Sequence, residues 1–137
     1  MKKRAVKLAV EAWFRKSLKI VGLSDWKVTF RDELPEADED GIPLACIFCF
    51  EKYRTAEVLL SKEFWELSRA EQRATLAHEL CHLFWARADS ISEQLQGELS
   101  PRLYGMWKRN LGDAEEYCVE QMSRLLCERL PYLGNCT

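Results

Sequence analysis

Both histidines of this 137-residue chain lie in one five-residue stretch, His78-Glu79-Leu80-Cys81-His82. The pattern H-E-x-x-H constrains the fold, because its two histidines share one face only when the stretch is helical. The surrounding sequence favours a helix. Ser68 and Glu71 form an S-x-x-E capping box, and apolar residues surround the histidines. We therefore predict a helix from Ser68 to about Trp85, with the motif in its middle.

Two imidazoles on one helix face can bind the same metal ion, and zinc is the ion typical of this motif. Zinc lowers the pKa of a bound water to about 7, so Glu79 can take its proton near neutral pH. The alternative is an ordinary helix with two surface histidines, but here the pattern uses every histidine of the chain. We predict a zinc site with His78 and His82 as ligands and Glu79 as general base.

A third zinc ligand is expected, because catalytic zinc sites use three protein ligands and leave one position for water. With no histidine left, this ligand must be Asp, Glu or Cys. The start of a predicted C-terminal helix carries Glu115, Glu116 and Glu120. Acidic residues favour a helix N-terminus through the helix dipole, which accounts for Glu115 or Glu116 but not for Glu120, one turn further along.

An H-E-x-x-H helix followed by a helix with two acidic residues four apart resembles the gluzincin metallopeptidases. The chain length is similar to that of the minigluzincins, of peptidase domains of the ImmA/IrrE type and of small phage zincin-like proteins. The resemblance covers about residues 42–130. It implies that Glu116 is the third zinc ligand and that Glu120 hydrogen-bonds a ligand histidine. It also implies that the strand at 56–61 forms the edge of the sheet and pairs with an extended peptide.

Helical periodicity bears on the choice between Glu115 and Glu116. At about 100° per residue, Glu115 falls inside the apolar face of the helix, whereas Glu116 and Glu120 fall on its flank. A ligand belongs at the border between core and cleft, because one coordination position stays open to water. The flank also lets Glu120 accept the second ring N–H of His78 or His82. We expect Glu116 to be the third ligand, and Glu115 is the alternative. If Glu116 binds the metal, Glu115 should contribute little to zinc affinity.

The order of the predicted elements indicates an α+β fold rather than alternating βαβ units. With the resemblance, we expect a single zincin-like domain over residues 1–137. It would contain an N-terminal helix, a small three-stranded sheet, the H-E-x-x-H helix and C-terminal helices. Beyond the motif helix, the predicted elements are a helix at 3–21, strands at 26–31, 42–50 and 56–61, an acidic loop at 32–41, and helices at 100–112 and 114–130.

Composition narrows the classes of partner. Lys and Arg total 20 and Asp and Glu total 22, so the net charge of −2 gives no electrostatic reason to expect nucleic-acid binding. No apolar run approaches the ~20 residues of a membrane span, and Lys7 and Glu11 interrupt the apolar part of a would-be signal peptide. We expect a cytoplasmic monomer that acts on a peptide or protein substrate, with neither nucleic acid nor membrane as a partner.

The six cysteines are expected to be reduced. Cys46 and Cys49 form C-x-x-C, a spacing that zinc knuckles and redox pairs use. Inside a strand, however, residues three apart point to opposite faces. Core cysteines are therefore favoured over a thiol-based redox protein.

The predicted function is zinc-dependent hydrolysis of peptide bonds. Many gluzincins stabilise the tetrahedral oxyanion with a downstream His or Tyr. No further histidine exists here, and the candidates are Tyr104, Tyr117 and Tyr132. This departure and the short chain favour a second hypothesis, a catalytically weak or inactive zincin-like protein that regulates or binds a partner.

Overall fold

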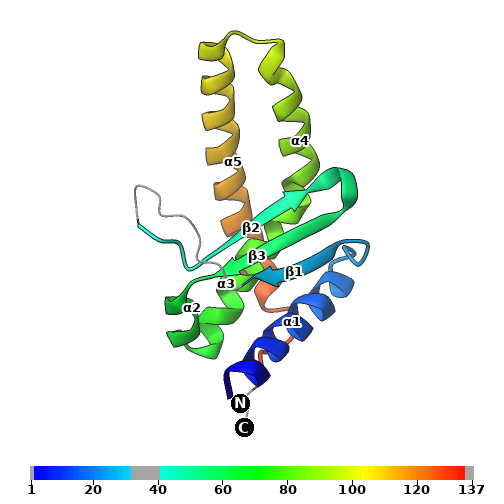
Figure 1. Cartoon of the computed structure of the whole chain (residues 1–137), viewed down its shortest axis with the longest axis vertical. Coiled ribbons are helices and arrows are strands. Elements are labelled where there is room, and N and C mark those ends of the chain that lie inside the picture. The colour runs from blue at the N-terminus through cyan, green and yellow to red at the C-terminus, as the bar shows by residue number, and fades with distance from the viewer. Residues whose placement is uncertain (1, 32–40, 135–137) are drawn as a thin grey trace.

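Three strands form one sheet in the order β1-β3-β2 (Figure 1). β1 (Lys27–Arg31) runs parallel to the central strand β3 (Thr55–Leu60), and β2 (Ala45–Phe50) runs antiparallel to it. The computed structural model describes residues 2–31 and 41–134. Residues 32–40 of the predicted acidic loop lie outside these ranges. The α+β class and all three predicted strands are confirmed, with bounds that differ by one to three residues.

The predicted edge position of the strand at 56–61 is wrong. This strand, β3, pairs on both sides and is the most buried of the three, with Ala56, Val58, Leu59 and Leu60 all covered. A strand that is apolar on both faces belongs in the middle of a sheet, where both faces are packed. β2 is the edge strand that contacts the motif helix.

The N-terminal helix α1 (Lys2–Ile20) confirms the helix predicted at 3–21. Its buried stripe includes Val10, Trp13 and Phe14, and the Phe14 ring meets Phe30 of β1 edge to face at 5.6 Å. Gly22 adopts a positive φ of 79°, which favours glycine, and the helix ends just before it.

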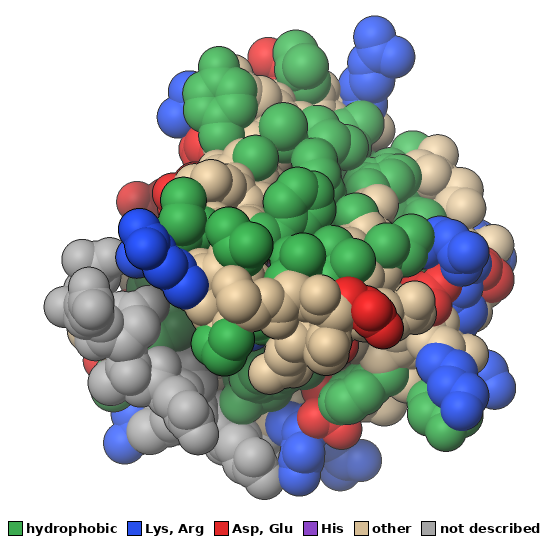
Figure 2. Space-filling view, turned by 90° about the horizontal axis from the view of Figure 1, so that it is seen from above, with side chains coloured by type: hydrophobic (Ala, Val, Ile, Leu, Met, Phe, Trp, Pro, Cys, Tyr) green, Lys and Arg blue, Asp and Glu red, His purple; other side chains and the backbone are tan. Residues whose placement is uncertain are grey.

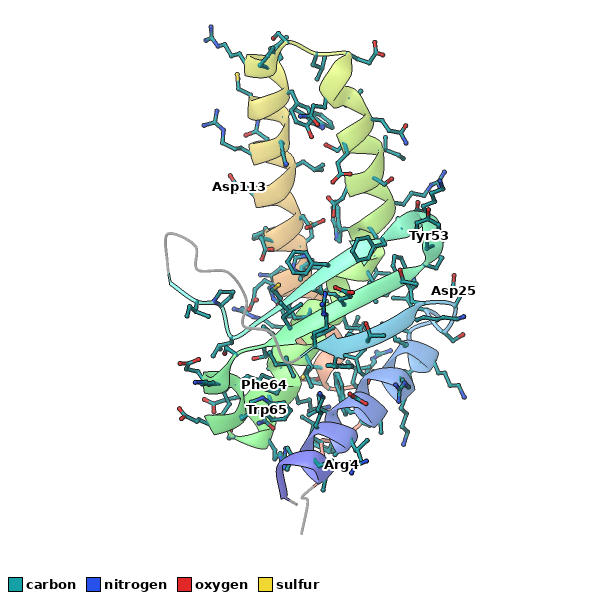
Figure 3. The ribbon with its side chains drawn as sticks, in the orientation of Figure 1. Arg4, Asp25, Tyr53, Phe64, Trp65 and Asp113 are labelled. Atoms are coloured by element: carbon teal, nitrogen blue, oxygen red, sulfur yellow. The ribbon has the colours of Figure 1, made fainter. Side chains whose placement is uncertain are left out.

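The motif helix begins after a short helix, α2 (Lys62–Glu66), which the sequence did not predict. Phe64 of α2 is fully buried, and its ring contacts Trp65 (Figure 3). Ser68 then caps α3 (Arg69–Cys81). The Ser68 hydroxyl accepts the Glu71 N–H at 3.2 Å, and the Glu71 carboxylate accepts the Ser68 N–H at 2.9 Å. The predicted capping box is therefore confirmed.

The predicted extension of this helix to about Trp85 is wrong, because α3 ends at Cys81. A 3₁₀ turn, η2 (His82–Trp85), leads into α4 (Ala86–Gln94), which was not predicted. The histidine motif therefore lies at the C-terminal end of α3 and not in its middle. Positive charge is stabilised at that end by the helix dipole.

The last helix, α5 (Pro101–Cys127), is continuous over 27 residues. Ser100 caps it by accepting the Leu103 N–H at 3.3 Å, as predicted. The predicted break at Gly112 and Asp113 is wrong, because one glycine costs a helix only about 1 kcal/mol and the rest of α5 outweighs this. α4 and α5 form a hairpin that projects from the sheet (Figure 1), with the 3₁₀ turn η3 (Leu95–Gly97) near its tip.

None of the helices in the described ranges combines the length and the apolar character that a membrane span requires.

Arg73 of α3 holds the C-terminal end of α5. Its guanidinium donates to the backbone carbonyls of Cys127, Leu130 and Pro131, the latter two at 2.6 and 3.0 Å. The Trp13 indole of α1 donates to the same Pro131 carbonyl at 2.6 Å. The Cys127 carbonyl ends α5 and has no partner within the helix, so this donor helps to satisfy it. The bonds to Leu130 and Pro131 hold the segment that follows, and together they fix the end of α5 against α3.

The continuity of α5 leads to a prediction for Gly112, where nothing lies within 4 Å of the position that a Cβ would occupy. Gly112→Ala should raise the free energy of unfolding by about 0.5–1 kcal/mol, because alanine has the higher helix propensity. Urea denaturation measures this. The matched control is Gly22→Ala, which should destabilise the protein because of its positive φ. A less stable Gly112→Ala protein would contradict a continuous α5.

Candidate metal centre

The packing of α3 against α5 brings the two histidines close to three glutamates. His78 lies in the last turn of α3, and His82 is the first residue of η2. Their ring centroids are 5.2 Å apart. The structure thus brings together the predicted ligands of α3 and α5.

The Glu116 carboxylate faces the Nε2 atoms of both histidines. Its Oε2 is 3.3 Å from Nε2 of His78, and its Oε1 is 3.2 Å from Nε2 of His82. Two ligand atoms that each lie about 2.0–2.1 Å from a tetrahedral ion are about 3.3–3.4 Å apart. Each of these two separations, taken by itself, suits two ligand atoms on one ion. The Glu116 side chain is 60% exposed, so this side of the centre is open to water.

The second ring nitrogens also face carboxylates. Nδ1 of His78 is 3.1 Å from Glu120, and Nδ1 of His82 is 3.2 Å from Glu115. The sequence predicted the contact of Glu120 but missed that of Glu115. The position of Glu115 inside the apolar face of the helix could have predicted this contact, because a carboxylate buried there needs a polar partner.

The chemistry of this donor set fits a cation. A neutral imidazole carries one N–H, so if Nδ1 donates to Glu120 or Glu115, Nε2 points a lone pair toward Glu116. A lone pair and a carboxylate repel each other unless a proton or a metal ion lies between them. Two imidazole nitrogens and one carboxylate are a ligand set of catalytic zinc sites. Among the described residues, two groups have ligand atoms that all lie within 4.8 Å of one another. One is His78, Glu79 and His82, and the other is His82, Glu115 and Glu116, so His78 and Glu116 fall in different groups.

Asp89 of α4 extends the support behind His82. Burial and a hydrogen bond with Glu115 raise the pKa of Asp89 to about 7. Burial would also raise the pKa of Glu115, but hydrogen bonds with His82 and Asp89 outweigh it, and the net shift is downward. When Asp89 is protonated it can donate to the Glu115 carboxylate, whose buried Oε1 has no hydrogen-bond partner among the described residues. The sequence analysis missed Asp89. Only its position, about two helical turns after His82, could have indicated that it lies near this histidine.

The charges around His82 raise its own pKa. Burial acts to lower it, but the hydrogen bond with Glu115 and the negative charges of Glu79 and Glu116 outweigh burial. The metal-free centre therefore favours a protonated imidazole.

Glu79 lies between the histidines and the edge strand β2. Glu79 is only 8% exposed, and this burial raises the pKa of its carboxyl group to about 7. The charge of Glu116 acts in the same direction, whereas His82 and the backbone N–H of Ile47 oppose it. A carboxyl group with this pKa can both accept and return a proton near neutral pH.

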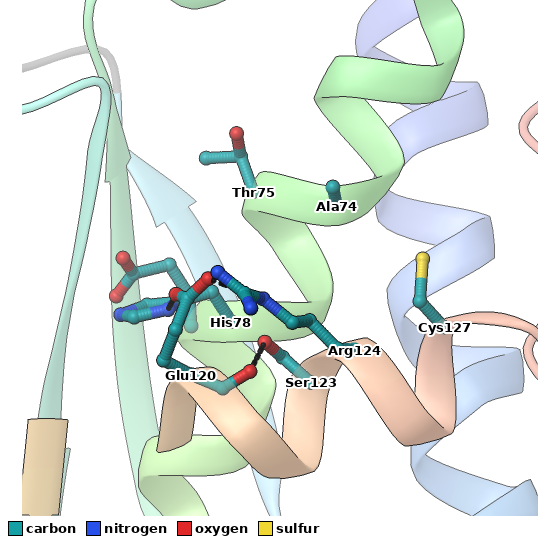
Figure 4. A pocket seen from close by; sticks show the side chains of 8 residues that line it. Ala74, Thr75, His78, Glu120, Ser123, Arg124 and Cys127 are labelled. Carbon is teal, nitrogen blue, oxygen red and sulfur yellow. Dashed lines mark hydrogen bonds and ion pairs between the residues drawn. The ribbon is translucent and has the colours of Figure 1, made fainter. Parts of the chain in front are cut away.

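A pocket of about 420 Å³ opens beside His78 (Figure 4). Arg124 of α5 is the cation of this pocket, and its Nε donates to Glu120 at 3.1 Å. Ser123 donates to the Glu120 backbone carbonyl at 3.0 Å, as Figure 4 shows. Sequence reasoning missed Arg124, although it lies one helical turn after Glu120. The residues that line the pocket are Ala74, Thr75, His78, Glu79, Glu120, Ser123, Arg124 and Cys127.

The three tyrosines proposed for the oxyanion do not line this pocket. Tyr104 lies in the first turns of α5, far from the centre along the helix. Tyr117 and Tyr132 are largely exposed, and the Tyr132 ring stacks on the Arg73 guanidinium at 4.5 Å.

The five cysteines within the described ranges are free thiols, and Cys136 lies outside those ranges. Cys46 and Cys49 occupy opposite faces of β2, as predicted from strand alternation. Burial raises the pKa of both thiols, that of Cys49 to about 12. Thiols with raised pKa values are poor nucleophiles, which disfavours redox chemistry.

Comparison with known proteins finds no match: no family model, curated protein sequence or solved structure matches the chain.

The geometry predicts a graded loss of zinc affinity. Glu116→Ala should reduce affinity most, because it removes a ligand. Glu120→Ala and Glu115→Ala should each reduce it about 10–100-fold by releasing a histidine ring. Competition with a chromophoric chelator measures these affinities, and Glu128→Ala, at the far end of α5, is the matched control. Full affinity in Glu116→Ala would refute its assignment as a ligand.

The pKa shifts predict how the stability of the metal-free protein depends on pH. Glu79 and Asp89 ionise near pH 7 in the folded state but near pH 4.5 and 3.8 when unfolded. The unfolded state therefore releases these protons first, and stability falls as pH rises from about 5 to 8. The raised pKa of His82 acts in the same direction, because its stabilising proton is lost over this range.

Thermal unfolding in the presence of a chelator should therefore give a lower Tm at pH 8 than at pH 5.5. Glu79→Gln should reduce this dependence, because the amide does not titrate. A Tm that rises across this interval would contradict the predicted direction.

Proposed function

We propose that the protein is a zinc-dependent metallopeptidase of the gluzincin type with a zincin-like fold. His78, His82 and Glu116 would hold the ion. The observation that carries the proposal is the Glu116 carboxylate, which faces the Nε2 atoms of both histidines at 3.2–3.3 Å. Buried Glu79 beside this cluster supports a hydrolytic role over a purely structural site.

The edge strand β2 supports a peptide as the substrate. Within the described ranges, β2 pairs only with β3, so its other side can accept an extended peptide as an additional strand. The backbone N–H of Ile47 in β2 acts on Glu79, so a peptide on this strand would lie near the general base. β2 takes the role that the sequence had predicted for the strand at 56–61.

Zinc, when bound, would supply a Lewis acid that polarises the scissile carbonyl and lowers the pKa of a water. Glu79 takes a proton from the attacking water and returns it to the leaving amine. Glu120 and Glu115 accept the Nδ1 protons of the histidines, which orients Nε2 of both rings. Asp89 in turn holds Glu115.

A second candidate is a zincin-like protein that binds a partner with little or no turnover. This candidate is favoured by the position of the tyrosines, because none of them lines the pocket beside His78. In this case the centre would bind zinc but would lack a tyrosine hydroxyl to stabilise the oxyanion.

Glu79→Gln tests the peptidase proposal. The variant should bind zinc as the wild type does, but kcat/KM on a fluorogenic peptide library should fall about 10²–10⁴-fold, because the amide cannot accept the proton. Glu63→Gln, at an exposed position of α2, is the control and should retain full activity. Equal cleavage by both variants would exclude Glu79 as the base. Zinc-loaded wild type that cleaves nothing in the library would favour the second candidate.

A further inference from the structure

The hairpin of α4 and α5 exposes large apolar side chains. Ile91 of α4 and Leu103, Met106 and Trp107 of α5 are each 45–54% exposed. Val119 is the first residue of α5 that is buried as a whole, so the residues of the preceding five turns all remain at least partly exposed. Viewed from above, hydrophobic side chains gather across this end of the molecule (Figure 2). Monomeric proteins rarely leave a contiguous apolar patch uncovered.

These four side chains share one face of the hairpin. The Trp107 indole donates to the Ser92 hydroxyl at 2.8 Å, which identifies the sides on which α4 and α5 meet. At about 100° per residue, Ile91 lies to one side of Ser92. Because the helices run antiparallel, Leu103 and Met106 lie to the same side of Trp107. We call these four residues the hairpin face.

Charged residues border the hairpin face with alternating sign. Along α4, Arg87 lies at the base of the hairpin and Glu98 follows at its tip. Along α5, the order is reversed, with Asp113 at the base and Arg102 at the tip (Figure 3 labels Asp113). All four are exposed, and Arg87 also pairs with Glu51 of its own chain at 3.4 Å. Glu98 directly follows the 3₁₀ turn η3 and Arg102 lies in the first turn of α5, so both lie at the tip of the hairpin.

We propose that the hairpin face binds a second copy of this chain in an isologous dimer, contrary to the monomer expected from the sequence. A two-fold axis parallel to the helices places α4 on the partner's α5 and brings Glu98 to the partner subunit's Arg102. A two-fold axis across the helices brings Glu98 to the partner subunit's Arg87. Each arrangement joins opposite charges around a buried apolar centre, which matches the apolar core and polar rim of homodimer interfaces. The pattern of charges is therefore self-complementary.

Sedimentation velocity from about 1 to 100 μM tests the dimer, since association depends on concentration. The wild type should approach twice the chain mass of 16.0 kDa. Leu103→Glu should raise the dimer dissociation constant by about 100-fold, because the two-fold axis repeats a roughly tenfold loss. Leu8→Glu on α1 is the matched control, because Leu8 is 57% exposed and Leu103 is 54% exposed. Circular dichroism should show both variants folded, since neither side chain is buried.

Charge reversal identifies the arrangement. Glu98→Arg should weaken the dimer in either arrangement. Adding Arg102→Glu restores it if α4 lies on the partner's α5, and adding Arg87→Glu restores it if α4 lies on the partner's α4. Restoration by neither second change would overturn the charge-directed dimer.

Two other results would overturn the proposal. One is a wild type that remains at the mass of a single chain at all concentrations, which would leave the hairpin face to a different partner. The other is a dimer that Leu103→Glu and Leu8→Glu affect equally, which would locate the interface elsewhere.

Discussion

The register of α5 against α3 is the constraint on which the candidate centre depends. The histidines come from one helix and the carboxylates from another, so neither helix can form the site alone. Arg73 sets the register by donating from α3 to the carbonyls that end α5. Trp13 binds the same segment and connects α1 to it. A hydrogen-bonded helix end thus determines which carboxylates face His78 and His82.

Repulsion among the carboxylates where α3 meets α5 opposes folding unless positive charge is supplied. Glu79, Glu115, Glu116 and Glu120 surround two imidazoles, and the protein adds few cations nearby. Arg124 offsets one carboxylate at the pocket, and a proton shared with Asp89 offsets another. The remaining negative charge faces the Nε2 atoms. Such a concentration of carboxylates destabilises a bare protein and is compensated when a cation binds.

Local chemistry accounts for what the sequence could predict. The Ser68–Glu71 capping box and the strands β1 and β2 depend on the residues of short local segments, and they appear where expected. The meeting of the histidines with Glu116 and Glu120 was predicted from the resemblance to the gluzincins, and the flank position of both glutamates on the helix supported it. Metal binding and peptide hydrolysis remain predictions.

The features that the sequence could not predict depend on long-range packing. The central position of β3 is decided by which strands flank it, and alternation within one strand contains no such information. Gly112 and Asp113 resemble a helix boundary, but a small local cost does not break a helix supported at both ends. Glu115, Asp89 and Arg124 acquire roles only because particular faces of α3, α4 and α5 meet.

Because α5 is unbroken, the number of residues between Glu116 and Cys127 sets the distance and the rotation between its two ends. One end is held by Arg73 and the other carries the carboxylates. Exchanging side chains along this segment leaves its length unchanged, whereas adding or removing one residue would rotate every carboxylate by about 100° relative to the histidines. The site should therefore tolerate substitution between these points far better than a change in length. Spacing, more than residue identity, is what this helix must preserve.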